Sequence, residues 1–125
     1  MDPFCFKRYF KSINQTVSSI APERLVEISE LVKAVSSKSK KIILVGNGGS
    51  AAMASHVAVD FTKAAGVRAV NFNEADLITC FANDYGYENW VAEALKAYAD
   101  SGDLLILISS SGKSPNIINV NSIAF

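Results

Sequence analysis

Cysteine and histidine are scarce in this 125-residue sequence. Cys5 and Cys80 are the only cysteines and lie in separate apolar segments. They provide neither a disulfide framework nor the clustered ligands of a zinc knuckle, so we expect buried or half-buried free thiols, as in a reducing cytoplasm. His56 is the only histidine, so a site that needs two imidazoles cannot take both from this sequence.

Long hydrophobic runs and an excess of one charge are also missing. No apolar run approaches the roughly 18 residues that span a bilayer, and the segment MDPFCFKRYF lacks the apolar centre of a signal peptide. Lys and Arg total 12 and match 12 Asp and Glu, so the charge balance does not indicate nucleic-acid binding. We expect a cytoplasmic protein with neither nucleic acid nor membrane as a partner.

The hydrophobic content is high, at half of all residues, which predicts a buried core in one compact domain. Apolar residues recur at steps of three and four from Phe6 to Ile20 and again from Leu25 to Val35. This period is typical of amphipathic helices. The sequence therefore predicts one domain, 1–125, with a helical segment over 1–37 and an α/β core over 38–125.

Beyond residue 38, short apolar runs alternate with helical patterns. We predict strands, a helix that ends near Gly66, a short and then a longer helix on either side of DYGY, and the start of a final helix. The predicted strands are 41–49, 67–73 and 103–112, and the predicted helices are 50–66, 74–84, 88–102 and 114–125. Strands that are apolar on both faces indicate a parallel sheet covered by helices on both sides, an α/β fold.

Two of the predicted strands end in turns rich in glycine and serine. The first turn is GNGGS at 46–50, and the second is SSSGKS at 109–114. Each opens a helix, whose free N–H groups and positive dipole end attract phosphate. Serine is also a common helix N-cap, so a purely structural role for these turns stays open. Two such turns on one sheet edge would hold one phosphate from two sides.

Other phosphate-binding motifs fit less well. Gly46, Gly48 and Ala51 satisfy the dinucleotide pattern G-x-G-x-x-G/A, but Glu74 lies later than the acidic residue that holds the ribose, at roughly 20 residues. That alternative predicts an oxidoreductase domain whose NAD binding depends on Glu74. The triphosphate loop is excluded, because GKS would need a glycine where Leu107 stands.

Three segments together resemble a known family. GNGGSAAMASHVAVDF, FANDYGYENW and LISSSGKSPNII have the order and spacing of the sugar isomerase (SIS) domain. The resemblance implies a three-layer α-β-α sandwich with a parallel sheet, and N-terminal helices that pack between the subunits of a homotetramer. It also implies an aldose–ketose isomerisation of sedoheptulose 7-phosphate to D-glycero-D-manno-heptose 7-phosphate, in bacterial lipopolysaccharide or capsule synthesis.

The resemblance assigns roles to individual residues. His56 falls on a zinc ligand, and Asp60 falls where the family has a glutamate that is both ligand and acid–base group. The pair is four residues apart, which places both on one helix face. The residues implied to contact the sugar or its phosphate are Asn47, Gly48, Gly49, Ser50, Asn83, Asp84, Ser109, Ser110, Ser111 and Ser114.

Two departures from the family matter. Asp60 is one methylene shorter than glutamate, and catalysis is sensitive to shifts of about 1 Å. The family domain also continues beyond the equivalent of Phe125, with a glutamine and a second histidine that complete the zinc site, so the resemblance indicates a truncated domain. An incomplete metal site leaves a second hypothesis open: a non-catalytic SIS module that binds phosphosugar or associates with a replication initiator.

Overall fold

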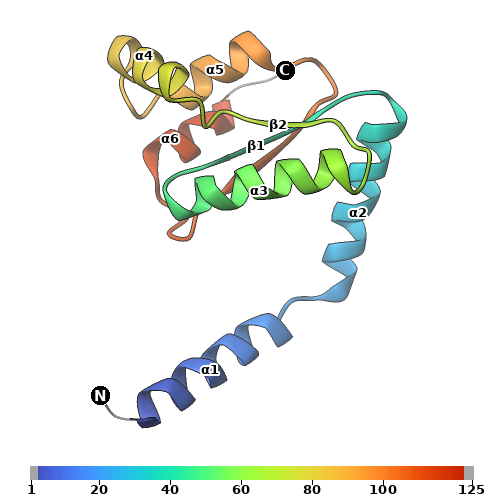
Figure 1. The fold of residues 1–125 in the computed structure, drawn as a ribbon, viewed down its shortest axis with the longest axis vertical. Helices are drawn as coiled ribbons and strands as arrows, with labels where there is room; N and C mark the ends of the chain where they lie inside the picture. The colour runs from blue at the N-terminus through green and yellow to red at the C-terminus, as the bar shows by residue number, and fades with distance from the viewer. Residues whose placement is uncertain (1–2, 123–125) are drawn as a thin grey trace. The chain divides into compact units, whose positions relative to one another are not determined.

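The computed structural model describes residues 3–122, with α-helices, three strands and one 3-10 helix (Figure 1). The elements are α1 (Pro3–Ser18), α2 (Pro22–Ser37), β1 (Ile42–Gly46), α3 (Gly49–Lys63), β2 (Ala69–Asn71), α4 (Ala75–Tyr85), α5 (Trp90–Tyr98), β3 (Leu104–Ile108), α6 (Pro115–Ile118) and the 3-10 helix η1 (Asn119–Ser122). They form two compact units, residues 1–31 and 32–125.

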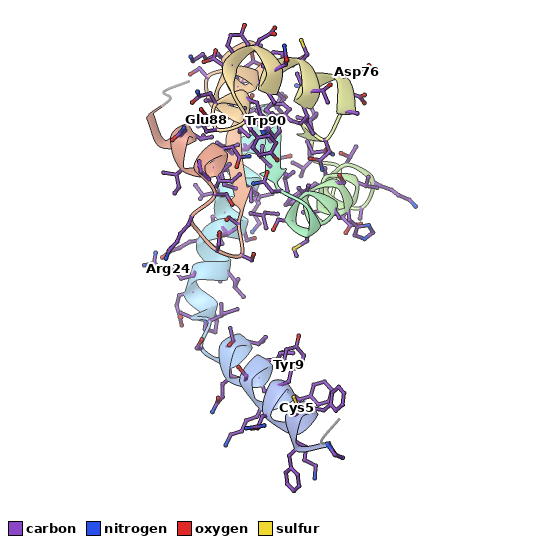
Figure 2. All side chains as sticks on the ribbon, turned by 90° about the vertical axis from the view of Figure 1, so that its left-hand side faces the viewer. Cys5, Tyr9, Arg24, Asp76, Glu88 and Trp90 are labelled. Carbon is purple, nitrogen blue, oxygen red and sulfur yellow. The ribbon has the colours of Figure 1, made fainter. Side chains whose placement is uncertain are left out.

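The first unit contains α1 and the first part of α2, within the segment that was predicted to be helical. No residue of α1 is buried, and its aromatic residues, among them Tyr9 and Phe10, are exposed. Cys5, labelled on α1 in Figure 2, is exposed as well. The expectation of a buried or half-buried thiol is therefore wrong at this position. No helix in residues 3–122 is long and apolar enough to cross a membrane.

The sheet of the second unit is parallel, as predicted, with β1 between β2 and β3. Ile42 is in register with Ala69 on one side and Leu104 on the other. The pairing of β1 with β3 runs to Gly46 and Ile108, so these two strands end at the same level. All five residues of β1 are buried, which explains why this strand is apolar without interruption.

Helices cover both faces of this sheet (Figure 1). Alternate residues of β1 point to opposite sides: Ile43 and Val45 join the cluster formed with α4, α5 and α6, which includes Trp90 and Leu95. Ile42 and Leu44 join the cluster formed with α3 and Val35 of α2. The predicted three-layer α-β-α arrangement is confirmed for the described residues.

Two predictions about α4 and α5 are wrong. The first of these helices has 11 residues and the second only 9, so the helix that was predicted to be the longer one is the shorter. The second helix is shorter because it ends at Tyr98, and the Asp103 carboxylate accepts a bond from the Asp100 N–H in the turn that follows. Cys80 is exposed rather than buried or half-buried. Leu77 and Phe81 of α4 pack against the core, whereas the Cys80 thiol lies 4.0 Å from the carboxylate of the exposed Asp84.

A buried ion pair fixes the amino ends of β1 and β3. Lys41 Nζ lies 2.6 Å from Asp103 Oδ2 and 2.7 Å from Asp100 Oδ2, and the Asp103 side chain is 1% exposed. Burial alone raises the pKa of Asp103, but bonds from the Lys41 side chain and from the N–H groups of Asp100 and Lys41 outweigh it and lower the pKa below 3.8. Burial lowers the pKa of Lys41, but its two carboxylate partners raise it above 10.5.

Candidate functional site

The two predicted turns meet at the carboxyl edge of the sheet. Gly46 and Ile108 are the last residues of β1 and β3 and are paired in register. Asn47 and Ser109 therefore begin the two turns side by side. Ligands of parallel α/β proteins bind at this edge.

The glycine turn is shaped by close contact between its own residues. A Cβ atom at Gly46 would lie 2.6 Å from the backbone carbon of Ser50, so only glycine fits there. Gly48 is the N-cap of α3 and has a φ of +52°, in the region that favours glycine. At Gly48 and Gly49, an added Cβ would meet no protein atom within 4 Å. The space in front of this helix start is therefore open to a ligand.

The serine turn is held by hydroxyl groups. Ser109 Oγ accepts a bond of 3.1 Å from the Gly112 N–H, and Ser111 Oγ accepts one of 3.1 Å from the Lys113 N–H. The two hydroxyl oxygens lie 3.5 Å apart. Ser110 and Ser111 are exposed, and Ser109 is half-buried. The hydroxyls are thus gathered at the sheet edge, where they can exchange their backbone partners for a ligand.

Capping does not explain the serines at the helix starts. Gly48, not Ser50, is the N-cap of α3. Ser114 is the N-cap of α6, but its side chain makes no capping hydrogen bond. The two helices also differ, because α3 has 15 residues and α6 has only four before η1 begins. The expected dipole contribution is therefore much larger at the glycine turn.

A polar cluster that sequence reasoning missed joins the two turns. Asn47 Nδ2 donates to Asn116 Oδ1, and Asn116 Nδ2 donates back to Asn47 Oδ1, both over 2.9 Å. The Tyr87 hydroxyl donates to the same Asn47 oxygen over 3.2 Å. The Tyr87 side chain is half exposed, so its hydroxyl lies at the surface of the site. The available signal was an asparagine directly after Ser-Pro, at the start of a predicted helix.

Asn83 and Asp84 lie near the end of α4 and are exposed. Asn83 Nδ2 donates to Asp84 Oδ1 over 2.9 Å, so the two side chains pair with each other. From the segment FANDYGYENW it is Tyr87, two residues after the end of α4, whose side chain reaches the glycine turn. The structure therefore connects this segment to the site through a residue that was not predicted.

His56 and Asp60 share one face of α3, as predicted. Their Nε2 and Oδ2 atoms are 3.5 Å apart, and the side chains are 80% and 61% exposed. Within residues 3–122 no third His, Cys, Asp or Glu joins them to form a group that could hold a metal ion. Catalytic zinc takes three protein ligands. The described residues by themselves do not make a zinc site.

The cavity of about 320 Å³ beside β2 is separate from these residues. It is lined mainly by apolar side chains, including Val70, Phe72, Leu77 and Tyr98, and contains none of the predicted site residues. A phosphosugar needs hydrogen-bond donors, and Lys41, the cationic residue of this lining, is already paired with Asp100 and Asp103. We therefore place the candidate site at the two turns, where hydroxyl, amide and backbone N–H groups are gathered.

Fold and turns together define a parallel α/β domain of the kind that takes small ligands at the carboxyl ends of its strands. The family model described as the SIS domain matches residues 8–124. The chain therefore belongs to the SIS domain family.

Several relatives are phosphoheptose isomerases. The chain is 32% identical to the phosphoheptose isomerase of Fusobacterium nucleatum over 119 residues and 38% identical to that of Thermodesulfovibrio yellowstonii over 104 residues. These alignments cover 90% and 78% of this chain but 61% and 52% of the two relatives. A solved phosphoheptose isomerase from Neisseria gonorrhoeae superposes with a TM-score of 0.83 at 32% identity, over 94% of this chain and 65% of that one.

Proposed function

We propose that this chain forms the phosphosugar-binding part of a sugar-phosphate isomerase, with sedoheptulose 7-phosphate as substrate and D-glycero-D-manno-heptose 7-phosphate as product. The observation that carries the proposal is the meeting of the two turns at one sheet edge, with Asn47 and Ser109 following paired strand ends. Similarity to proteins named phosphoheptose isomerase supports the choice of sugar.

The groups at the edge suit the two ends of such a substrate. The hydroxyls of Ser109, Ser110, Ser111 and Ser114, the Ser50 hydroxyl and the N–H groups at the start of α3 bind the phosphate oxygens. Asn47 and the open positions at Gly48 and Gly49 accept the sugar chain against the backbone. Asn83 and Asp84 contact sugar hydroxyls if the substrate extends toward the end of α4.

The reaction moves a proton between neighbouring carbons. A base takes the proton from C1 of the ketose, an enediol forms, and a proton is returned to C2 while the O1 hydroxyl becomes the aldehyde. Asp60 is the acid–base group that the resemblance assigns. His56 lies seven residues after the start of α3, roughly 10 Å along the helix at about 1.5 Å per residue, a span that a seven-carbon phosphosugar can bridge.

We also propose that His56 and Asp60 supply two ligands of a zinc site whose remaining donors lie outside the described residues. Both side chains are exposed on the outer face of α3 and lie 3.5 Å apart, which suits two adjacent ligands. Equilibrium dialysis with zinc tests this directly. Zinc binding that is lost in His56→Ala supports it, and binding unchanged by His56→Ala and Asp60→Asn contradicts it.

A homo-oligomer, tetrameric by resemblance, is part of the proposal. Exposed Phe6 and Phe10 on α1 offer apolar contact area for a second copy, and Met53 and Val59 are exposed near His56 on α3. Light scattering after gel filtration gives the mass in solution. A Phe6→Asp, Phe10→Asp double variant should shift an oligomer toward monomer, and a wild-type monomer contradicts this part.

A second candidate is a non-catalytic SIS module that binds phosphosugar. The observation in its favour is that no third metal donor joins His56 and Asp60 within the described residues. Incubation of the full chain with sedoheptulose 7-phosphate and zinc, followed by separation of aldose from ketose, distinguishes the two. Aldose formation supports the isomerase, binding without turnover supports the module, and absence of binding contradicts both.

A further inference from the structure

We propose that Asn116 and Tyr87 are positioning residues, which fix the carboxamide of Asn47 so that the glycine turn and the serine turn bind a phosphosugar as one unit. The inference rests on the proposed function of the two turns. It goes beyond that function because neither residue belongs to the set that the family resemblance assigns to the substrate.

The amide pair is a rigid link between the two turns. Asn116 is 1% exposed and lies two residues after the end of the serine turn, as the second residue of α6. Its side chain and that of Asn47 exchange two hydrogen bonds of 2.9 Å, so the two amides form a closed ring. Rotation of either side chain would break both bonds and leave a buried amide without a partner.

Tyr87 adds the third contact, and it is itself held in place. Its hydroxyl donates to Asn47 Oδ1 over 3.2 Å, while its ring lies 6.4 Å from the ring of Trp90. Trp90 is almost completely buried, and Figure 2 shows its side chain directed into the interior. Asn119 Nδ2 also donates to the Glu88 carbonyl over 3.0 Å, which ties the Tyr87 segment to the region after α6.

The arrangement leaves Asn47 one defined donor. Its oxygen accepts from both Asn116 and Tyr87, and one Nδ2 hydrogen is donated to Asn116. Within residues 3–122 the second Nδ2 hydrogen is paired with no protein acceptor. Asn47 is half-buried at the sheet edge, so this N–H is available to an oxygen acceptor on the sugar phosphate. A carboxamide that rotates freely would present its N–H donor and its oxygen acceptor alternately, and would discriminate less between acceptor and donor groups on a ligand.

The first experiment needs no ligand. In the full ¹⁵N-labelled chain, the side-chain NH₂ signals of Asn47 are compared between wild type, Tyr87→Phe and Asn116→Asp by relaxation and hydrogen exchange. Tyr85→Phe is the matched control, because it removes the same hydroxyl group two residues away from Tyr87. The ring of Tyr85 packs against the ring of Phe81. We expect faster motion and exchange in the two test variants only. Unchanged Asn47 signals in Tyr87→Phe overturn the proposal, including where Asn116→Asp does not fold.

The second experiment measures binding of sedoheptulose 7-phosphate and of inorganic phosphate by calorimetry. Tyr87→Phe should weaken phosphosugar binding about tenfold, the effect of one lost hydrogen bond, and should change phosphate binding less than about twofold. In an Asn47→Ala background the Tyr87→Phe effect should vanish, because Tyr87 acts through Asn47. Additive effects overturn the proposal.

The two experiments separate failure of this inference from failure of the proposed function. If the wild type binds neither ligand, the proposed function is contradicted, and the Asn47 signals still decide whether Tyr87 and Asn116 position that side chain. If the wild type binds phosphosugar and both the signals and the affinity are unaffected by Tyr87→Phe, the proposed function stands and the positioning role is contradicted.

Discussion

The two turns lie at the same carboxyl edge of the sheet, but different physical interactions fix their conformations. The glycine turn is set by steric fit: Gly46 has Ser50 against it, and Gly48 has a positive φ. The serine turn is set by hydrogen bonds from its own N–H groups to Ser109 and Ser111. The first turn is therefore preformed for a ligand, while the second has to exchange internal bonds for ligand bonds.

This difference teaches which substitutions affect folding and which affect binding. Steric fit is lost as soon as one atom is added, because protein interiors are close-packed. A hydrogen bond between exposed groups is replaced by water at small cost. We therefore expect the glycine turn to control stability and the serine turn to control affinity.

Gly46→Ala is the substitution with the largest expected effect. The added Cβ would lie 2.6–2.8 Å from three atoms of Ser50, two of them backbone, so we expect a loss of about 3 kcal/mol in the free energy of unfolding. Urea denaturation measures it. Gly49→Ala is the control, because no atom lies within 4 Å and alanine favours the helix, and its stability should stay within about 1 kcal/mol of wild type. Equal losses of unfolding free energy in Gly46→Ala and Gly49→Ala would contradict the steric explanation of this turn.

Asp103 lies at the amino ends of β1 and β3, opposite the two turns, and the loss of its carboxylate should destabilise both strands. Asp103→Asn should lower the free energy of unfolding by about 2 kcal/mol at neutral pH, because the bonds to Lys41 and Asp100 involve charged groups. Both turns should lose stability together. Glu88→Gln, at an exposed carboxylate, is the control and should change stability little.

The same variant has a defined pH dependence. Because the pKa of Asp103 is lower in the folded state than its usual 3.8, its charge stabilises the fold above pH 3.8, and this contribution is lost as the pH falls through the folded pKa. The stability difference between wild type and Asp103→Asn should therefore shrink below pH 3.8. A constant difference down to pH 2 would contradict the assignment.

The double variant Ser109→Ala, Ser111→Ala tests the serine turn. Its free energy of unfolding should fall by about 1 kcal/mol or less, because water can satisfy the exposed N–H groups of Gly112 and Lys113. Its affinity for sedoheptulose 7-phosphate should fall at least about tenfold. Thermal denaturation and calorimetry separate the two quantities. Ser101→Ala, in the exposed turn before β3, is the matched control and should change neither.

The smallest effect on stability is expected at the His56–Asp60 pair. Both side chains are mostly exposed, and pairs of this kind contribute about 0–1 kcal/mol. The free energy of unfolding of Asp60→Asn should therefore lie within about 0.5 kcal/mol of the wild-type value, while the isomerase turnover that we propose should be lost. A large loss of stability would show that the pair belongs to the structural framework rather than to the site.

Local patterns in the sequence were enough to predict the framework of the fold. The apolar runs that end at Gly46 and Ile108 predicted parallel strands followed by turns, and the structure places β1 and β3 in register. β1 is buried, whereas β3, which within residues 3–122 has a neighbour on one side only, is half-buried along its length. The i,i+4 spacing of His56 and Asp60 predicted a shared helix face. These features depend on neighbours along the chain, so the sequence contains the information directly.

The missed features depend on contacts between distant segments. Asn47 and Asn116 are 69 positions apart and Tyr87 and Asn47 are 40 apart, and no periodicity indicates such a meeting. The exposure of Cys80 required the rotation of α4 about its axis, which Leu77 and Phe81 determine by packing against the core. Residues 3–122 contain no third donor for the zinc site that we propose.

The meeting of Asn47, Tyr87 and Asn116 has a consequence for how this domain can change by mutation. The three side chains are hydrogen-bonded to one another, so the effect of replacing one depends on which residues occupy the other two positions. Tolerated substitutions at these positions should therefore occur together. The same holds for protein engineering. A loop graft that moves only GNGGS into another scaffold would transfer the backbone shape but leave behind the two side chains that orient its asparagine.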